Sequence, residues 1–381
     1  MNIYICYARD SLTTGNYFEI ALKRQGHQVF YIGPAFANNV GYQSNIDLYA
    51  LSNSGYLPSP DFVLFIESPA SYFPRGLEKI SCPTACYIID IHLGTRLKLQ
   101  FLPFFDYVFC AQKDYIPLLQ RHHQQVSWLP LACDPVIHGK QSLSKTSEVG
   151  FVGNSYASVR RSALLSAIEK EFSINDYHKM YAKELLSTVY SQAKIVFNCS
   201  INGDVNMRVF EALASGTLLL TDRVENGLYD LFDEGVHLIT YENENEMLQC
   251  IRYFLDHEHE RELIALEGMH HVLEKHTYEH RVLSMLETIF QSSARKVAPI
   301  RQFDQENVIA TYAGIYAMYR VVDPVIDQLD VAWKCKSGRL RVLLKVIIVL
   351  SRRFNAIFRI TPSLRELASV LGYRFSKKKK L

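Results

Sequence analysis

Two charged side chains with opposite signs, Arg208 and Glu211, stand three residues apart at the start of a predicted helix. The stretch reads NMRVFEALASGTLLLTD (206–222), so the helix is expected to end near Gly216 and to precede a short apolar strand. Free N–H groups and the helix dipole favour anions at such a position. An arginine there can hold a diphosphate by two hydrogen bonds, and a carboxylate one turn later can accept from paired ribose hydroxyls. Spacing alone fits a nucleotide-diphosphate site or an exposed i,i+3 ion pair equally well.

The first third of the chain alternates apolar strands with helices. Strands are predicted at 2–8, 27–33, 62–68, 85–92, 105–111 and 126–135, and helices at 13–26 and 114–122. Short continuous apolar strands that alternate with helices are typical of a parallel sheet covered on both faces.

The polar segment 139–148 predicts a linker, after which the alternation resumes. Strands are predicted at 149–154, 194–200, 217–222 and 235–241, helices at 158–172 and 183–193, and a long helical stretch at 243–290 with breaks near Asp256 and Gly268. We therefore expect two α/β units in tandem. Because ligands of open α/β sheets bind beyond the carboxyl ends of the strands, the cleft between the units should hold the site.

The stretch 206–222 resembles the donor-site signature of GT-B-fold glycosyltransferases, in the branch typified by the spore-maturation protein CgeB. The segments that match this branch in order are EVGFVGNSYASVRR (148–161), AKIVFNCSINGDVNMRVFEALASG (193–216), LFDEGVHLITY (231–241) and EKHTYEHR (274–281). WLPLACDPVIH (128–138) resembles the crossover between the two domains of that family. The likeness is firm over 128–290, looser over 1–127, and does not extend to 295–381.

The resemblance implies an α/β chain of the GT-B class, with two Rossmann-like domains facing a cleft. Residues 1–138 would form the acceptor domain and 148–295 the nucleotide-sugar domain. Residues 296–381 would form a helical, basic C-terminal extension.

The resemblance also assigns donor-binding residues. Glu211 would hold the ribose and Arg208 would face the diphosphate. Gly153 and Asn154 would let backbone amides approach phosphate, and Arg160 would add positive charge. The larger retaining GT-B enzymes carry a second glutamate about two turns before the position of Glu211. Gly203 stands there in this chain, so its neighbour Asp204 is the candidate acid on this loop.

The acceptor side rests on YIIDIHLG (87–94), which places Asp90 and His92 at the end of a predicted buried strand. Residues two apart in a strand face the same side, so both should reach the cleft. Either could polarise an acceptor hydroxyl as a catalytic residue, or serve as a structural cap at the strand end. Asp134 and His138, at the domain crossover, are interpreted as hinge residues rather than catalysts.

No metal or cofactor is expected apart from the nucleotide-sugar donor. The chain contains no Asp-x-Asp, which is the metal–diphosphate clamp of the other main glycosyltransferase fold. Cationic side chains and a helix N-terminus would replace that clamp. VGFVGN (149–154) lacks a full GxGxxG pattern, and no acidic residue follows at the right strand end, which disfavours a dinucleotide-dependent oxidoreductase.

The C-terminal segment is strongly basic although the formal net charge of the whole chain is only +2. Residues 331–381 contain 14 Lys and Arg but a single acidic residue, Glu366. We favour an interfacial helix on an anionic membrane surface through 339–381. A helix that packs on a partner protein is the second reading. Nucleic-acid binding is disfavoured because few aromatic residues interleave with the charges.

Location follows from features that the sequence lacks. The eight cysteines are scattered, and no signal peptide or apolar run long enough to span a membrane is found. We expect a cytoplasmic protein, peripheral on the inner face of the membrane.

These observations predict a metal-independent, retaining glycosyltransferase. It would move a sugar from a nucleoside-diphosphate sugar to a hydroxyl of a glycan, a lipid-linked glycan or a protein glycan. Two alternatives stay open. A nucleotide-sugar epimerase or hydrolase on the same fold would need more acid and base residues in the cleft than the sequence reveals. A non-catalytic GT-B subunit that binds a glycan or acts as a scaffold would suit the unmatched C-terminal residues.

Overall fold

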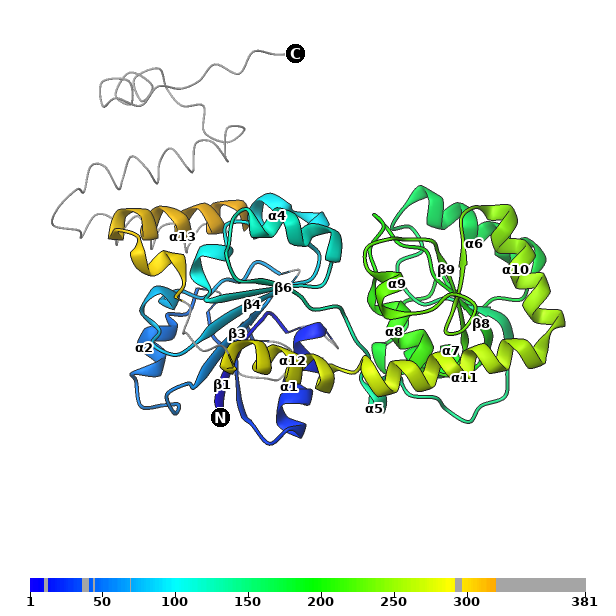
Figure 1. The fold of residues 1–381 in the computed structure, drawn as a ribbon, viewed down its shortest axis with the longest axis horizontal. Coiled ribbons are helices and arrows are strands. Elements are labelled where there is room, and N and C mark those ends of the chain that lie inside the picture. Colours follow the sequence, from blue (N-terminus) through cyan, green and yellow to red (C-terminus); the bar gives the residue numbers. More distant parts are fainter. Residues whose placement is uncertain (10–12, 36–40, 44, 69, 292–296, 320–381) are drawn as a thin grey trace, which may run out of the picture.

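A computed structural model of the chain describes residues 1–9, 13–35, 41–43, 45–68, 70–291 and 297–319. Two α/β domains lie side by side and are joined at α5 (Pro135–His138) and at the start of α12 (Tyr278–Phe290) (Figure 1). Most of the predicted basic extension, including the predicted membrane-binding segment 339–381, lies outside the described residues.

The N-terminal domain is built on a six-stranded parallel sheet in the order β2-β1-β3-β4-β5-β6. The strands are β1 (Asn2–Cys6), β2 (Gln28–Ile32), β3 (Phe62–Ile66), β4 (Thr84–Ile88), β5 (Tyr107–Cys110) and β6 (Val126–Trp128). Every residue of β3, β4 and β5 is buried, which explains why their sequences read as continuous apolar runs. The strand order reverses between β1 and β3, and ligands of doubly wound sheets bind at such a reversal.

The helices of this domain come from both ends of the chain. Those from the first third are α1 (Thr14–Arg24), α2 (Leu48–Ser52), α3 (Thr95–Lys98) and α4 (Ile116–Gln120), with 3₁₀ turns at Leu77–Lys79, Ile91–Leu93, Leu102–Phe104 and Lys113–Tyr115. The helix α12 packs on α1, and the Tyr107 hydroxyl donates a hydrogen bond to the Ile289 carbonyl at 3.2 Å. A 3₁₀ turn at Pro299–Gln302 leads to α13 (Gln305–Tyr319). There the Tyr316 hydroxyl donates to the Phe73 carbonyl at 2.8 Å. The expected domain boundary at residue 295 thus lies beyond a helix that covers the N-terminal sheet.

The C-terminal domain is built on a four-stranded parallel sheet in the order β10-β9-β8-β7. The strands are β7 (Ser147–Gly150), β8 (Ala193–Phe197), β9 (Leu218–Asp222) and β10 (Ile239–Tyr241). The helices are α6 (Val159–Glu171), α7 (Leu186–Ser191) after a 3₁₀ turn at Lys183–Leu185, α8 (Met207–Ala214), α9 (Leu228–Leu231), α10 (Glu244–Asp256) and α11 (Glu258–Lys275).

The predicted helix break near Asp256 is confirmed, whereas the break predicted near Gly268 is wrong. The helix α11 runs through Gly268 without interruption and ends at Lys275. The glycine is needed for close packing instead, because a Cβ atom there would lie 2.3 Å from the His237 carbonyl oxygen. A glycine in a helix can therefore mark a tight contact rather than an end.

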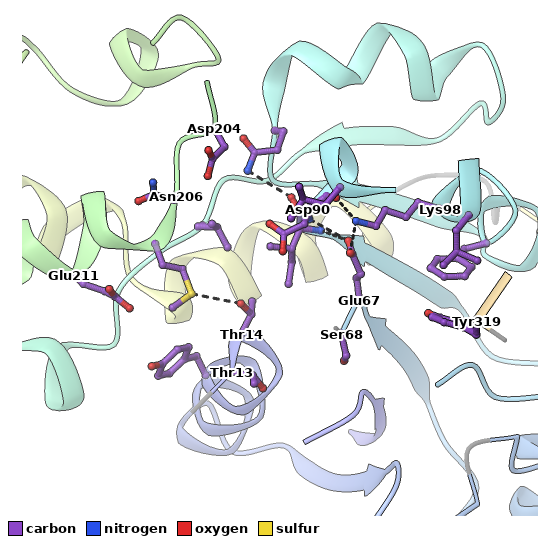
Figure 2. A pocket seen from close by; sticks show the side chains of 18 of the residues that line it. Thr13, Thr14, Glu67, Ser68, Asp90, Lys98, Asp204, Asn206, Glu211 and Tyr319 are labelled. Carbon is purple, nitrogen blue, oxygen red and sulfur yellow. Dashed lines mark hydrogen bonds and ion pairs between the residues drawn. The ribbon is translucent and has the colours of Figure 1, made fainter. Parts of the chain in front are cut away.

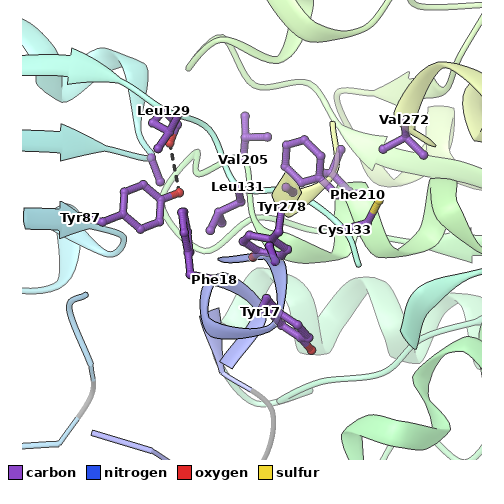
Figure 3. Close-up of a cluster of buried hydrophobic side chains, with 14 of the residues drawn as sticks. Tyr17, Phe18, Tyr87, Leu129, Leu131, Cys133, Val205, Phe210, Val272 and Tyr278 are labelled. Atoms are coloured by element: carbon purple, nitrogen blue, oxygen red, sulfur yellow. Dashed lines mark hydrogen bonds between the residues drawn. The ribbon is translucent and has the colours of Figure 1, made fainter. Parts of the chain in front are cut away.

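The two segments that cross between the domains are hydrogen-bonded to each other. The Cys133 N–H donates to the His276 carbonyl at 3.0 Å, and the Tyr278 N–H donates to the Cys133 carbonyl at 3.0 Å. The buried Arg281 guanidinium adds donations to the carbonyls of Pro130 and Leu131. A cluster of buried apolar side chains continues through this junction; Figure 3 shows members from both domains: Tyr17, Phe18, Tyr87, Leu129, Leu131, Cys133, Val205, Phe210, Val272 and Tyr278.

The cysteines and the hydrophobic character of the helices complete the description of the fold. No disulfide joins the seven cysteines in the described part of the chain. Among the helices of that part, none has the length and apolar character needed to cross a bilayer.

Candidate active site

A cavity of about 500 Å³ lies between the two domains (Figure 2). The N-terminal domain contributes most of its polar wall, and the C-terminal domain contributes the start of α8. The polar and charged residues that line it are Thr13, Thr14, Tyr17, Glu67, Ser68, Asp90, Lys98, Gln112, Asp204, Asn206, Glu211 and Tyr319. The segments after β1, β3 and β4 meet here, at the reversal in strand order where a ligand site is expected.

The helix α8 positions the predicted donor residues. It begins after Asn206, which has the extended backbone typical of an N-cap, and Gly216 lies just beyond its end with φ 63°. The Asn206 side chain does not cap the helix. Its Nδ2 donates to Asn198 Oδ1 at 3.3 Å, and its buried Oδ1 receives no hydrogen bond from any residue that the structure describes. Without that cap, the first N–H groups of α8 remain available to an anion.

Glu211 is buried on the cavity side of α8. Its Oε1 lies 3.7 Å from His138 Nε2, which lies 3.2 Å from the Tyr17 hydroxyl. The Asp134 N–H donates to His138 Nδ1 at 2.9 Å, so the proton of the neutral ring is on Nε2. Burial lowers the pKa of His138, although Glu211 and then Asp134 oppose this effect. The neutral imidazole therefore presents an N–H to Tyr17 and Glu211.

Asp134 and His138 lie at the crossover, where the sequence placed them as hinge residues. Asp134 caps α5 by accepting from the N–H groups of Val136 and Ile137, and its other oxygen pairs with Arg24 at 2.9 Å. The Arg24–Asp134 pair thus ties the crossover to α1 of the N-terminal domain, and His138 connects the crossover to Glu211.

Arg208 supports the turn that follows β7. Its Nη2 and Nε donate to the Val152 carbonyl at 2.7 and 3.1 Å, and its Nη1 donates to Asn198 Oδ1 at 2.6 Å. Gly153 has φ 142°, and a Cβ atom there would lie 2.4 Å from Arg208 Nη2. Glycine is therefore required by both backbone conformation and space. Asn154 is exposed, and its Oδ1 accepts from the Tyr156 N–H at 2.9 Å.

Arg160 lies in the first turn of α6, at the same edge of the sheet. It is exposed and pairs with Asp222, at the end of β9, with an N–O distance of 2.9 Å. Of the residues predicted to bind the donor, only Asp204 and Glu211 line the cavity. The others are not among the lining residues. Gly153 and Asn154 follow β7, Arg208 donates to the Val152 carbonyl next to them, and Arg160 pairs with Asp222 at the end of β9.

Asp204 is buried and closes the loop before α8. Its Oδ1 accepts from the N–H groups of Ile201 and Asn202 at 2.9 and 3.4 Å. Figure 2 places it on the side of the cavity opposite Glu67 and Lys98.

Asp90 lines the cavity, but the predicted strand over 85–92 is wrong beyond Ile88. The chain turns at Asp90 (φ −102°, ψ 52°) and forms a 3₁₀ turn at Ile91–Leu93. Asp90 and His92 therefore do not share a strand face, and His92 is absent from the described residues that line the cavity. Burial raises the pKa of Asp90, Lys98 and His92 oppose this, and Asp204 reinforces it.

Sequence reasoning missed Glu67 and Lys98. Glu67 follows β3 directly, and its Oε1 lies 2.5 Å from Lys98 Nζ, at the end of α3. Burial raises the pKa of Glu67, although the charge of Lys98 opposes that shift. An acidic residue directly after a buried apolar strand was a signal that could have revealed Glu67. Lys98, in a helix of four residues, gives no comparable signal.

A second connection between the domains lies away from the crossover at α5. Asn226 Nδ2 donates to Gln112 Oε1 at 2.5 Å and to the Gly203 carbonyl at 3.1 Å. Asn226 Oδ1 accepts from the Asp114 N–H at 3.0 Å. The two domains are thus connected at the crossover and, separately, through Asn226.

In the described part of the chain, no group of three or more His, Cys, Asp or Glu side chains is arranged to hold a metal ion.

Comparisons with known proteins agree with this architecture. Residues 149–287 match the sequence model of a family described as glycosyl transferase-like. A search of curated proteins gave no match.

Solved structures with a similar fold cover about three quarters of the chain. Sucrose-phosphate synthase from Thermosynechococcus elongatus is 10% identical, with a TM-score of 0.55 over 76% of this chain and 98% of that chain. HepE from Anabaena, in complex with UDP and glucose, is 11% identical, with a TM-score of 0.54 over 76% and 100% of the two chains. A glycosyltransferase from Rickettsia africae is 11% identical, with a TM-score of 0.54 over 77% and 99%.

The fold is that of the GT-B class, with two parallel-sheet α/β domains, as the sequence predicted. The likeness to the glycosyl transferase-like family covers residues 149–287 and so lies mainly in the C-terminal domain. The finer likeness to the CgeB branch stays a prediction.

Proposed function

We propose that the protein transfers a sugar from a nucleoside-diphosphate sugar to an acceptor hydroxyl, with retention of anomeric configuration and without a metal ion. The observation that carries this proposal is the pair of carboxylates Glu211 and Asp90. They come from different domains and line one cavity, beside a helix N-terminus that no side chain caps. Such a cavity can hold a donor against one wall and an acceptor against the other.

The donor would bind to the C-terminal domain. Glu211 would accept hydrogen bonds from the ribose hydroxyls, and the N–H groups at the start of α8 would face the diphosphate. Arg208 and Arg160 are the proposed cations. Both are partly committed to protein acceptors, so the phosphates would bind their remaining N–H groups. Gly153 and Asn154 would let backbone approach phosphate, with Asp204 next to the sugar.

The acceptor would bind to the N-terminal domain, where Asp90 would accept a hydrogen bond from its hydroxyl. The acceptor oxygen would form a bond to the anomeric carbon as the bond from that carbon to the diphosphate breaks. The nucleoside diphosphate would leave with the electron pair and take up the hydroxyl proton. Cations and helix N–H groups would stabilise the charge that develops on the leaving group.

A nucleotide-sugar hydrolase or epimerase is a second candidate. The cavity contains Glu67 and Lys98 in addition to Asp90 and Asp204, so it has more acidic and basic groups than the sequence alone revealed. Release of nucleoside diphosphate, or formation of a new nucleotide sugar, without any acceptor would favour this candidate.

For the acceptor we propose a glycan or lipid-linked glycan at a membrane, contacted through 339–381. The full chain should sediment with vesicles that contain anionic phospholipid but not with neutral vesicles, and high salt should release it. Equal binding to both kinds of vesicle, or none, would contradict the membrane proposal.

The donor site can be tested by thermal stabilisation with a panel of nucleoside diphosphates and their sugars. UDP and UDP-glucose come first because complexes of HepE contain them. A ligand that binds only the folded state raises the midpoint. One nucleotide should stabilise the wild type and the surface control Glu171→Ala, but not Glu211→Ala. If no nucleotide stabilises the folded wild type, the donor site is refuted.

A further inference from the structure

The backbone of Asp90 is held by side chains rather than by the sheet. After β4 ends at Ile88, Glu67 Oε2 accepts from the N–H groups of Ile89 and Asp90 at 2.8 and 3.1 Å. The Glu67 N–H itself donates to the Tyr87 carbonyl at 3.0 Å, which fixes Glu67 beside β4. One carboxylate oxygen thus accepts from two successive peptide N–H groups just beyond the end of β4.

Lys98 completes this arrangement from the other side. Its Nζ lies 2.5 Å from Glu67 Oε1 and also donates to the Asp90 carbonyl. The side chains of Lys98 and Glu67 are only 7% and 10% exposed. Burying two charges is costly, and a well-packed apolar pair is often at least as stable, so stability alone does not account for this ion pair.

The Asp90 carboxylate is free, in contrast to its backbone. No residue that the structure describes donates a hydrogen bond to it, and Figure 2 shows it at the cavity beside the Glu67–Lys98 pair. Glu67 and Lys98 therefore fix the backbone position of Asp90, while the carboxylate oxygens of Asp90 remain available to a ligand.

We propose that Glu67 and Lys98 are positioning residues, which hold both peptide groups of Asp90 and so fix the direction in which its carboxylate enters the acceptor half of the cleft. This inference rests on the proposed function, in which Asp90 accepts a hydrogen bond from the acceptor hydroxyl. Misplacement of such a group by even 1 Å can lower turnover about 100-fold.

The same pair balances the charge around Asp90. The charged or titratable groups that face this carboxylate are Lys98 from α3, His92 from the following 3₁₀ turn, Asp204 across the cavity and Glu67 after β3. Burial raises the pKa of Asp90, and Lys98 is the largest opposing influence. Loss of Lys98 would leave Glu67 as an uncompensated negative charge, whereas loss of the Glu67 charge would leave Lys98 as an uncompensated positive charge.

The test compares Lys98→Met, Glu67→Gln and the double variant, with Lys23→Met as the control. Lys23 also forms an ion pair with a glutamate, Glu19, but is half exposed and lies away from the cavity. Carboxyl ¹³C NMR of aspartate-labelled protein, with Asp90→Asn to assign the signal, would follow the ionisation of Asp90. The Asp90 titration should move to higher pH in Lys98→Met, to lower pH in Glu67→Gln, and stay near the wild-type midpoint in the double variant and in Lys23→Met.

Turnover then tests positioning itself, with the nucleotide sugar that stabilises the wild type as donor. Lys98→Met, Glu67→Gln and the double variant (the cleft variants) should each lose about 10-fold or more in kcat, while stabilisation by the donor stays at the wild-type value. Titrations that do not move, or that move in the same direction in both single variants, would overturn the inference, as would a kcat equal to that of Lys23→Met.

The failure of the inference can be told apart from the failure of the proposed function. A wild type without turnover, or an Asp90→Asn variant with full turnover, overturns both. An active wild type with an inactive Asp90→Asn variant, together with cleft variants that behave like Lys23→Met, overturns the positioning role alone. Far-UV circular dichroism and the thermal midpoint would identify any variant that fails to fold. If a single variant fails to fold, the kcat of the double variant, which has no uncompensated charge, decides whether the positioning role holds.

Discussion

The two walls of the cleft present their carboxylates in opposite ways. On the C-terminal wall, Glu211 lies inside α8, so the helix holds its backbone, and its side chain rests near His138 and Tyr17. On the N-terminal wall, Asp90 lies beyond the end of a strand, so Glu67 and Lys98 hold its backbone and its carboxylate is free. A carboxylate placed by a helix depends on local sequence, whereas one placed by side chains depends on residues that are distant in the chain.

The largest effect is expected from Asp90→Asn. This change removes the charge that we propose polarises the acceptor hydroxyl, and it should lower kcat by about 10²- to 10⁴-fold. Stabilisation by the nucleotide sugar should be unchanged, because the proposed donor site is on the other wall. Steady-state kinetics with thermal shifts would check both parts, and a variant with wild-type kcat would show that the Asp90 carboxylate takes no part in turnover.

Glu211→Gln should give the complementary result. The amide keeps the size of the side chain but accepts more weakly from ribose hydroxyls, so donor affinity should fall about 10- to 100-fold. Titration calorimetry with the stabilising nucleotide sugar would measure this, with Glu171→Gln as the surface control. Unchanged affinity would mean that the helix-borne carboxylate does not hold the donor.

Gly153→Ala would test how rigidly the C-terminal wall is built. The new Cβ atom would approach Arg208 Nη2 within 2.4 Å at a φ of 142°, so we expect a loss of about 1–3 kcal/mol in the free energy of unfolding. Gly203→Ala is the comparison variant without a close contact, since Gly203 has a positive φ of 71°, in the left-handed region, and no atom within 4 Å of the added Cβ. Equal losses in denaturant unfolding would show that backbone strain, not the contact with Arg208, dominates.

The smallest effect is expected for the ion pair that joins the two walls on the surface. Lys113 Nζ and Asp230 Oδ1 lie 2.5 Å apart, but their side chains are 42% and 47% exposed. Lys113→Met should therefore cost no more than about 1 kcal/mol in unfolding free energy, and high salt should abolish the difference. A larger loss that persists in salt would show that this contact is essential to the domain interface.

Much of the fold could be predicted from local patterns. Continuous apolar runs gave the parallel strands, and the polar segment 139–148 separated the two units. Glu211 could be predicted for the same reason, because the helix α8, its small residues and Gly216 all lie within one short stretch of sequence. Asp204, four residues upstream of Arg208, shares that locality.

The remainder depends on contacts between segments that are distant in the chain. Glu67 lies at the end of β4 and accepts hydrogen bonds from the N–H groups of Ile89 and Asp90, although it is more than twenty residues away in the chain. No local pattern around residues 85–92 reveals that these N–H groups bond to the Glu67 side chain. The same limit applies to Lys98, to the association of α12 with the N-terminal sheet, and to Gly268, whose role depends on the approach of His237.

The return of α12 and α13 to the first domain has a consequence for biosynthesis. The C-terminal sheet and its helices occupy one unbroken stretch, 147–275, so they can assemble as soon as that stretch has left the ribosome. The first sheet is translated earliest, yet α12, which packs on α1, follows α1 by about 250 residues, as the Gln25–Glu279 hydrogen bond shows. Until α12 is made, Phe18 lacks its contact with Tyr278, so the domain that is translated first is the last to complete its core.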